Sequence, residues 1–312
     1  MNVLVTGVCG YIGSELVAQL RDRDDVDRIV ALDNLSSGSP RVFFGQLDGS
    51  IEFHRGDVRE YGDVESVMRD VDTVVHLAAI TGAASTHDRR EETFAINLDG
   101  TENVLKAASK LGVEHVVFAS SCNVYGRATS TDIDETVDPD PINPYAETKL
   151  QAESLLSEYC ADGEMTGTAL RMSTNYGYSP GVRFNLVVNY FVFRALTGRA
   201  LTVYGDGSNW RPFIHVEDAA RAYADAACNP DAWSQTVYNV GNTDENYRVA
   251  DVAAIVREEV GDVDITYLED EHPGPSYHVN FDRLGETDFD PAWTLREGVR
   301  DLAQRFRSQI HD

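Results

Sequence analysis

The stretch that most constrains the fold of this chain is an apolar run followed at once by a glycine-rich turn. Val3-Leu-Val-Thr6 is typical of a buried parallel strand, and glycines at positions 7, 10 and 13 lead into a helical pattern over residues 14–21. Glycine there permits a tight turn, lets backbone N–H groups approach a pyrophosphate and lets the helix pack closely on the strand. The spacing is Gly-x-x-Gly-x-x-Gly rather than the commoner Gly-x-Gly-x-x-Gly, but its place between strand and helix predicts a dinucleotide site.

Alternation of apolar strands and helical patterns continues to Met172 and then becomes shorter and less regular. It predicts an α/β fold, a doubly wound parallel sheet of the Rossmann type, in which the first and fourth strands are neighbours at the site. A smaller α/β region that closes over a substrate is expected after it. The predicted strands are 3–6, 28–33, 51–55, 72–77, 115–121, 168–172, 201–204 and 236–240, and the predicted helices include 90–111, 184–196, 217–228, 249–260 and 295–307.

Acidic and small residues at the ends of these strands suggest how a dinucleotide is bound. Asp33 ends the second strand about twenty residues past the glycines, where a carboxylate accepts hydrogen bonds from the ribose hydroxyls and repels a 2′-phosphate, which favours NAD over NADP. Asp57 follows the third strand and either binds the adenine amino group or caps a helix. Ala78 and Ala79 leave room for the cofactor, and His76 is interpreted as a packed strand histidine without a catalytic role.

Tyr145 and Lys149 are four residues apart, which places them one turn apart on one face of a helix. A free tyrosine ionises near pH ~10, too high for a base at neutral pH. A lysine ammonium beside it favours the phenolate and moves that pKa toward the working range. Taken alone, the pattern is also that of a solvated surface pair. Tyr145 and Lys149 are therefore interpreted as catalytic only together with the dinucleotide pattern upstream.

The chain is strongly acidic, with a formal net charge of -26 and only three lysines. Such a charge argues against nucleic acid or an anionic membrane as a partner, because both require a basic patch. The acidic residues are spread along the chain, which favours a solvating surface suited to high salt over the alternative of an ordinary acidic mesophilic enzyme.

The cysteines and the apolar segments exclude several other classes of protein. Cys9, Cys122, Cys160 and Cys228 form no Cys-x-x-Cys pair, so neither a zinc site nor a disulfide framework is expected, and four buried thiols in a reducing compartment are predicted. No apolar stretch approaches the ~20 residues of a membrane span, and no signal-peptide pattern precedes the first strand. We expect a cytoplasmic protein.

Five motifs together resemble one family. Thr6-Gly-x-x-Gly-x-x-Gly13, Asp33, His76-Leu-Ala-Ala79, Ser120-Ser121 before Val-Tyr-Gly, and Tyr145-x-x-x-Lys149 are similar to the extended short-chain dehydrogenase/reductase family, the NAD-dependent sugar-nucleotide epimerases and dehydratases. The resemblance covers nearly the whole chain and implies a NAD-binding Rossmann domain at 1–172 plus 216–243 and a substrate domain at 173–215 plus 244–312. It also implies a homodimer, in which helices matching 90–111 and 145–160 pack as a four-helix bundle.

The resemblance implies a role for each matching residue. Tyr145 is the acid/base on a sugar hydroxyl, Lys149 holds the nicotinamide ribose and Ser121 hydrogen-bonds the reacting oxygen. Asn175 and Arg211 match residues that bind the substrate diphosphate, and Arg211 as a plain surface residue is the alternative. Asn185 and Tyr204 fall where the nucleotide base is contacted. The cofactor-binding set is Gly7, Gly10, Tyr11, Ile12, Gly13, Asp33, Asn34, Asp57, Val58, Leu77, Ala78, Ala79, Asn97, Tyr145 and Lys149, and no metal site is expected.

The two residues after Ser121 separate the subfamilies. Related 4,6-dehydratases resemble one another in an Asp-Glu pair there, whereas this chain has Cys122 and Asn123, so dehydration is not expected. An NDP-sugar 4-epimerase on a UDP-hexose is favoured. A net dehydrogenase or 4-ketosugar reductase stays open because His272 stands where many epimerases have a diphosphate-binding arginine. A non-catalytic NAD-binding protein is the third alternative.

Salt tests the interpretation of the acidic surface. We expect thermal stability and turnover to increase as KCl is raised from dilute to molar concentrations, because screening weakens the repulsion among carboxylates. Circular dichroism melting curves and activity assays across a KCl series measure both quantities. Maximal stability and turnover in dilute buffer would contradict the halophilic interpretation.

Overall fold

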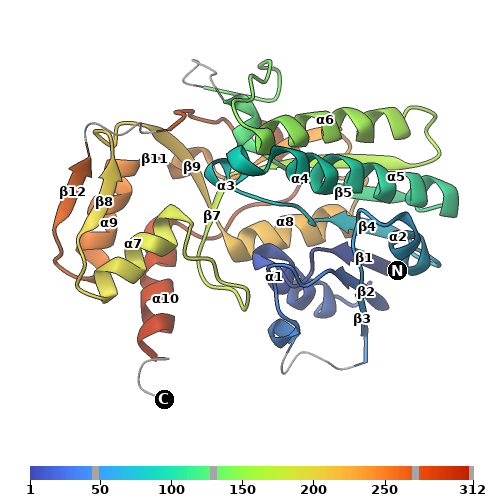
Figure 1. The fold of residues 1–312 in the computed structure, drawn as a ribbon, viewed down its shortest axis with the longest axis horizontal. Helices are drawn as coiled ribbons and strands as arrows, with labels where there is room; N and C mark the ends of the chain where they lie inside the picture. The colour runs from blue at the N-terminus through green and yellow to red at the C-terminus, as the bar shows by residue number, and fades with distance from the viewer. Residues whose placement is uncertain (44–48, 127–131, 269–273, 309–312) are drawn as a thin grey trace.

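A computed structural model describes residues 1–43, 49–126, 132–268 and 274–308. Its main element is a seven-stranded, wholly parallel sheet in the order β10-β6-β5-β4-β1-β2-β3 (Figure 1). β1 pairs with β2 on one side and β4 on the other, which confirms the predicted fold class and the neighbouring first and fourth strands. The strands are β1 (Asn2–Thr6), β2 (Arg28–Asp33), β3 (Ile51–Arg55), β4 (Thr73–His76), β5 (His115–Ser121), β6 (Thr166–Met172) and β10 (Val237–Val240).

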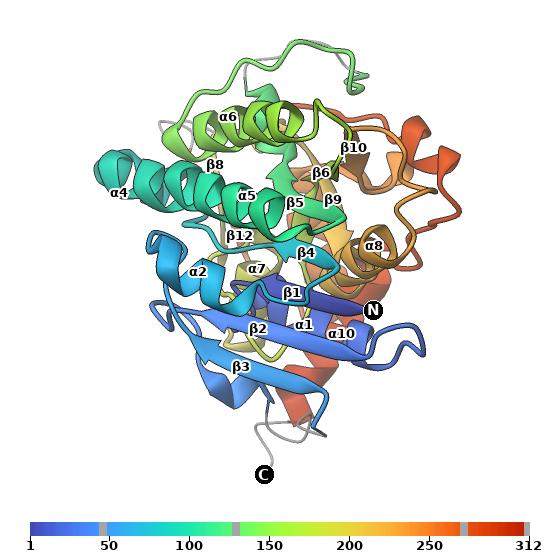
Figure 2. The ribbon, with the colours of Figure 1, turned by 90° about the vertical axis from the view of Figure 1, so that its right-hand side faces the viewer.

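Helices cover both faces of this sheet (Figure 2). On one face, Leu16 and Leu20 of α1 (Tyr11–Arg21) join Tyr223 of α8 (Val216–Cys228) in an apolar cluster. On the other face, Leu105 and Leu156 belong to a second cluster that unites three further helices. These are α2 (Tyr61–Val67), α5 (Gly100–Leu111) and α6 (Pro144–Tyr159), and between α2 and α5 the chain also forms α3 (Ala83–Thr86) and α4 (Arg90–Phe94). Burial of both faces explains why the strands read as continuous apolar runs.

The second region contains two small sheets, β11-β9-β7 and β12-β8, with their own apolar cluster. The division of the chain into two domains at the expected boundaries stays a prediction. No helix in the described part of the chain is both long enough and apolar enough to cross a membrane. The elements are β7 (Thr174–Tyr176), α7 (Val187–Leu196), β8 (Leu201–Tyr204), β9 (Trp210–His215), β11 (Asn246–Arg248), α9 (Val249–Val260), β12 (Ile265–Leu268) and α10 (Leu295–Ser308).

The structure corrects three details of the sequence interpretation. The helix expected over 90–111 contains a π turn at Ala95–Asp99, which separates α4 from α5. The helix expected from residue 184 begins only at Val187. The four cysteines are all free, but Cys160 and Cys228 are only partly buried, because each lies at the outer end of a helix rather than inside the sheet.

A buried ion pair joins α6 to the sheet. The Arg171 guanidinium on β6 contacts the Glu153 carboxylate on α6 at 2.7 Å, and both side chains are 6% exposed. Ser120 of β5 donates a hydrogen bond to the same carboxylate, and Arg171 also donates to the Tyr125 hydroxyl at 3.0 Å. Removing one partner of such a pair leaves an uncompensated buried charge, so the pair constrains where α6 lies. Because α6 also carries Tyr145 and Lys149, this contact positions the predicted catalytic groups.

Candidate functional site

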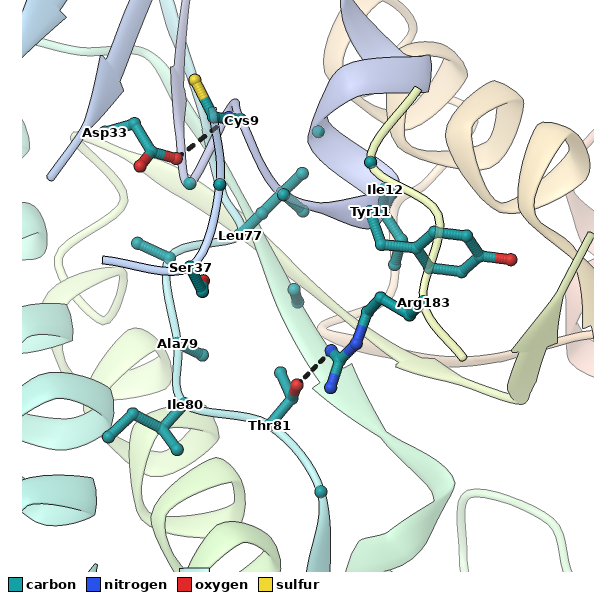
Figure 3. A pocket seen from close by; sticks show the side chains of 18 of the residues that line it. Cys9, Tyr11, Ile12, Asp33, Ser37, Leu77, Ala79, Ile80, Thr81 and Arg183 are labelled. Carbon is teal, nitrogen blue, oxygen red and sulfur yellow. Dashed lines mark hydrogen bonds between the residues drawn. The ribbon is translucent and has the colours of Figure 1, made fainter. Parts of the chain in front are cut away.

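A cavity of about 1000 Å³ opens where β1 and β4 are neighbours, at the carboxyl ends of the parallel strands (Figure 3). This is the place where an open α/β sheet binds ligands, because the order of the strands reverses there. The structure brings most of the predicted site residues together along its wall. They are Gly7, Gly10, Tyr11, Ile12, Gly13, Asp33, Asn34, Val58, Leu77, Ala78, Ala79, Ser121, Tyr145, Lys149, Asn175 and Asn185.

The glycine turn brings backbone into unusually close contact. A Cβ on Gly13 would lie 2.5 Å from the Gly7 carbonyl oxygen, and one on Gly7 would lie 2.7 Å from the Ala78 nitrogen. Gly7 also has a φ of 72°, which disfavours other residues. The first helical N–H to bond within α1 is that of Ser14, which donates to Gly10 at 3.0 Å. The preceding N–H groups and the positive end of the helix therefore face the cavity, as a pyrophosphate requires.

The Asp33 carboxylate holds the turn against the end of β2. One oxygen accepts a hydrogen bond from the Cys9 backbone at 2.9 Å (Figure 3). The other accepts one from the Leu35 backbone at 2.7 Å. Each carboxylate oxygen keeps further acceptor capacity for a ribose hydroxyl, because an ionised carboxylate offers about four acceptor sites. The contact of Asp33 with a ribose stays a prediction.

Asp57 lies beside the cavity rather than in its wall. Its carboxylate accepts hydrogen bonds from Arg59 and from the Asn34 amide, and these contacts hold the pKa of Asp57 well below its usual range. The alternative interpretation of Asp57 as a helix cap is wrong, because α2 begins at Tyr61 with Glu60 at the capping position. Direct contact between Asp57 and adenine stays a prediction.

Two elements assemble the predicted catalytic group. Ser121 is the last residue of β5, and Tyr145 and Lys149 occupy the first turns of α6. The start of that helix is fixed by Asn143, whose side-chain oxygen accepts a hydrogen bond from the Ala146 backbone at 2.9 Å. The Lys149 ammonium lies 5.8 Å from the centre of the Tyr145 ring, and both side chains are buried. The surface-pair alternative is therefore wrong for these two residues.

Burial dominates the electrostatics of this group. It raises the pKa of Tyr145, and the Ser121 hydroxyl and the Arg183 guanidinium oppose that rise. Burial also lowers the pKa of Lys149 to about 7, against the attraction of Glu153. The expectation that Lys149 brings the Tyr145 pKa down stays a prediction.

Neutral side chains surround Ser121. The Asn123 amide donates a hydrogen bond to the Ser121 hydroxyl oxygen at 3.1 Å and accepts one from Tyr277 at 3.2 Å. The buried Cys122 thiol donates a hydrogen bond to the Arg171 carbonyl oxygen. Of the described residues that line the cavity, only Asp33 and Glu92 carry a carboxyl group, and Glu92 pairs with Arg89.

Asn97 acts from behind the cavity wall. The π turn points its side chain at the loop after β4, where the amide exchanges two hydrogen bonds with the Ile80 backbone, at 2.8 and 3.0 Å. It also donates to Thr148, the neighbour of Lys149. Asn97 is 1% exposed and is not among the residues that line the cavity, so the structure gives it a supporting position rather than a cofactor contact.

The predicted substrate residues are divided between the cavity and its surroundings. Asn175 lines the cavity, and its amide oxygen is buried without a hydrogen-bond partner in the described structure, which leaves an acceptor for a ligand. Arg211 stacks on Tyr277, 4.7 Å from the ring centre, and Tyr204 on β8 is 56% exposed. Neither lines the cavity. His272 lies outside the described residues.

Sequence reasoning missed Arg183 and Thr81. The Arg183 guanidinium reaches across the cavity from the loop before α7 and donates a hydrogen bond to the Thr81 hydroxyl on the loop after β4 (Figure 3). Neither residue belongs to a recognised motif, and their meeting joins positions 102 residues apart. No local signal in the sequence pointed to this contact.

Comparisons with known proteins agree with this geometry. A model of the NAD dependent epimerase/dehydratase family matches residues 3–241. The Low-salt glycan biosynthesis protein Agl12 of Haloferax volcanii is 31% identical over 303 residues, 96% of each chain. The Thermus thermophilus UDP-glucose 4-epimerase, solved as a complex with NAD, is 29% identical with a TM-score of 0.85 over 98% of this chain and 99% of that one.

A second solved structure matches as fully. The UDP-N-acetylglucosamine 4-epimerase of Methanobrevibacter ruminantium, in complex with UDP-N-acetylmuramic acid, is 27% identical with a TM-score of 0.89 over 99% of this chain and 98% of that one. The matched relatives also include sugar-nucleotide dehydratases and a decarboxylase. Overall similarity therefore identifies a group of related chemistries, and the choice among them depends on the site.

The glycine turn generates one prediction. Gly13→Ala should lower the free energy of unfolding by about 1–3 kcal/mol and reduce dinucleotide retention, because the new methyl group meets backbone that cannot move aside. Gly62→Ala is the matched control, since its Cβ would meet nothing within 4 Å in α2 and should stabilise the protein by about 0.5–1 kcal/mol. Urea unfolding and cofactor content after gel filtration measure both effects. Equal behaviour of the two variants would refute the close-contact argument.

Burial of Lys149 generates a second prediction. Its pKa of about 7 lies below the ordinary 10.5, so the unfolded chain binds more protons than the native state between these values. The free energy of unfolding should therefore rise with pH in that window, by at most about 1.4 kcal/mol per pH unit from this group. Lys149→Met should reduce the slope, and Lys106→Met, at an exposed site on α5, should not. Chemical denaturation of dinucleotide-free protein at constant KCl tests this, and identical slopes in wild type and Lys149→Met would count against it.

Proposed function

The chain belongs to the NAD-dependent epimerase/dehydratase family, and within that family we propose that it is a nucleoside-diphosphate-sugar 4-epimerase acting on a UDP-hexose. The observation that carries the proposal is the neighbourhood of Ser121. A hydroxyl, a phenol and an amine gather there on one cavity, while Cys122 and Asn123 occupy the positions of the acidic pair expected in a dehydratase. A site with these groups supports oxidation and reduction at one carbon but offers no carboxylic acid to expel water.

The described residues fit the family's cofactor, NAD. The glycine turn leaves no room for side chains where the backbone must approach a pyrophosphate, and the first-turn N–H groups of α1 supply donors for it. The Asp33 carboxylate at the end of β2 suits unmodified ribose hydroxyls and repels a 2′-phosphate. When bound, NAD accepts a hydride from the sugar and later returns it.

The protein's own groups handle the proton. Tyr145 takes the proton of the sugar C4 hydroxyl onto its phenol oxygen as C4 is oxidised to a ketone, and it gives the proton back when the ketone is reduced on its other face. Ser121 hydrogen-bonds the reacting oxygen and is itself oriented by the Asn123 amide. Lys149 binds the nicotinamide ribose. The Arg183 guanidinium lowers the pKa of the Tyr145 phenol and so favours the ionised phenol, the form that accepts the proton of the sugar hydroxyl.

The substrate binds in the part of the cavity bordered by the loop before α7. Asn175 presents its unpaired amide oxygen there, and Asn185 lies in the same wall. Arg211 holds the diphosphate from the rim and Tyr204 contacts the nucleotide base, which requires β8 and β9 to approach the cavity when substrate binds. The protein acts in the cytoplasm as a homodimer that pairs the long helices over residues 90–111 and 144–159.

Removal of the Tyr145 hydroxyl tests the mechanism. Tyr145→Phe should lower kcat for interconversion of UDP-glucose and UDP-galactose by about 10²–10⁴-fold while NAD stays bound, because only the proton acceptor is lost. Tyr267→Phe, at an exposed tyrosine on β12, is the matched control and should keep wild-type turnover. Normal turnover by Tyr145→Phe would exclude the proposed acid/base role.

The same assay separates the alternatives. A 4-epimerase regenerates its cofactor in every turnover, so absorbance of NADH should not accumulate in proportion to product. Stoichiometric NADH would establish a net dehydrogenase or reductase instead. Bound NAD with no turnover of any nucleotide sugar would support a non-catalytic NAD-binding protein.

A further inference from the structure

Arg183 is a cation inside the cavity that no part of the mechanism uses to bind a ligand. It follows Pro180-Gly181-Val182, a segment that lies directly over the glycine turn, where the Gly181 N–H donates to the Ser14 hydroxyl at 3.1 Å. From there the side chain extends into the cavity beside Tyr11 and toward Thr81 (Figure 3). Its backbone is held in turn by Asn189, whose amide donates to the Arg183 carbonyl oxygen at 3.0 Å. These two hydrogen bonds fix the backbone from which the Arg183 side chain extends into the cavity.

The contacts of this guanidinium are all neutral. It donates to the Thr81 hydroxyl and, through Nε, to the Asn185 amide oxygen at 3.2 Å. Within the part of the chain that the structure describes, Arg183 makes no ion pair. This is unexpected in a chain with 52 acidic and 26 basic residues. The more deeply buried Arg171, in contrast, has the Glu153 carboxylate as its partner.

An unpaired, partly buried guanidinium creates a preference for an anion. Burial lowers the pKa of Arg183, which shows that its surroundings disfavour the bare charge. A ligand that brings a carboxylate or phosphate to this point regains the lost interaction through charge-assisted hydrogen bonds, and the planar fork of arginine suits two oxygens. A neutral ligand leaves the charge uncompensated.

The position of Arg183 favours the sugar as the carrier of this anion. The pyrophosphate of the dinucleotide already has a binding site in the glycine turn and the first N–H groups of α1. Thr81, which Arg183 contacts, follows Ile80, and Asn97 links the Ile80 backbone to Thr148 on α6. Because α6 carries Tyr145, the group that acts on the sugar, the guanidinium stands at the reacting end of the cavity, where it also opposes the rise in the Tyr145 pKa. Thr81 and Asn185, its present partners, are hydroxyl and amide groups that a carboxylate can replace or share.

We propose that Arg183 is a specificity-determining residue that selects sugar nucleotides whose sugar carries a carboxylate, a hexuronate, over neutral hexoses. The inference rests on the proposed sugar-nucleotide site and narrows its substrate class. Arg183 binds the two carboxylate oxygens from the loop before α7, and Thr81 on the opposite wall orients the guanidinium. Tyr145, Ser121 and Lys149 keep the roles already given to them at C4.

Binding measurements test the proposal without turnover. Isothermal titration of NAD-loaded Tyr145→Phe protein with UDP-glucuronate and with UDP-glucose gives two dissociation constants. We expect UDP-glucuronate to bind at least about tenfold more tightly, since a charged hydrogen-bonded pair is gained. Adding Arg183→Gln should weaken the binding of UDP-glucuronate at least about tenfold more than the binding of UDP-glucose. Arg183→Lys should give an intermediate ratio of the two dissociation constants, because lysine keeps the charge but lacks the planar fork of arginine. Arg199→Gln, which removes an exposed arginine after α7, is the matched control and should change neither constant.

Several results would overturn the proposal. The first is that the Tyr145→Phe protein binds UDP-glucuronate and UDP-glucose equally tightly, or binds neither detectably. The second is that Arg183→Gln weakens the binding of both nucleotide sugars equally, which would assign the guanidinium to a phosphate. The third is that the Arg183→Gln variant loses NAD. Circular dichroism confirms that each variant is folded. Epimerisation of either nucleotide sugar by wild type is scored separately: turnover of UDP-glucose without a preference for UDP-glucuronate refutes the inference and keeps the proposed function. Arg183-dependent preference without turnover of either sugar refutes the function and keeps the inference.

Discussion

The close contact between the first strand and the first helix is the constraint on which the rest of the structure depends. Gly7 and Gly13 allow the backbone of the turn to touch itself and the start of the loop after β4 at distances that a methyl group would not permit. Because α1 then begins immediately beside β1, its free N–H groups face the crevice between β1 and β4. The absence of side chains at Gly7 and Gly13 thus fixes the packing of α1 on β1, the position of the loop after β4 and the anion site.

A second theme is the use of positive charge in a very acidic protein. Most arginines in the salt bridges described here lie at the surface, whereas Lys149 and Arg171 are buried and Arg183 is partly buried. Lys149 and Arg183 line the cavity. Arg171 is paired with Glu153 and positions α6. Lys149 and Arg183 lack a paired carboxylate in the described structure, and burial lowers the pKa of each. Both charges are therefore left available to an anionic ligand.

Several side chains that matter here act through another residue. Asn97 shapes the cavity by holding Ile80, Asn123 orients Ser121, and Glu153 fixes α6 and raises the proton affinity of Lys149. The π turn at Ala95–Asp99 is needed for the first of these contacts, since it breaks the regular helical spacing and turns Asn97 inward. Such residues support catalysis without touching the reacting atoms, and their substitution should act on geometry before chemistry.

The sequence by itself determined the doubly wound sheet, the glycine turn, Asp33 and the Ser121, Tyr145 and Lys149 group. Strand and helix periods and motif spacings are local properties, and the sheet then brings the carboxyl ends of its strands together. Only the tertiary structure placed Asn97 behind the wall, Asp57 beside Asn34, and Arg183 opposite Thr81. It also decided the electrostatics, because burial lowers the pKa of Lys149, a shift that no sequence pattern predicted. These features arise from contacts between distant segments and from exclusion of water, neither of which leaves a periodic or short-range signal in the chain.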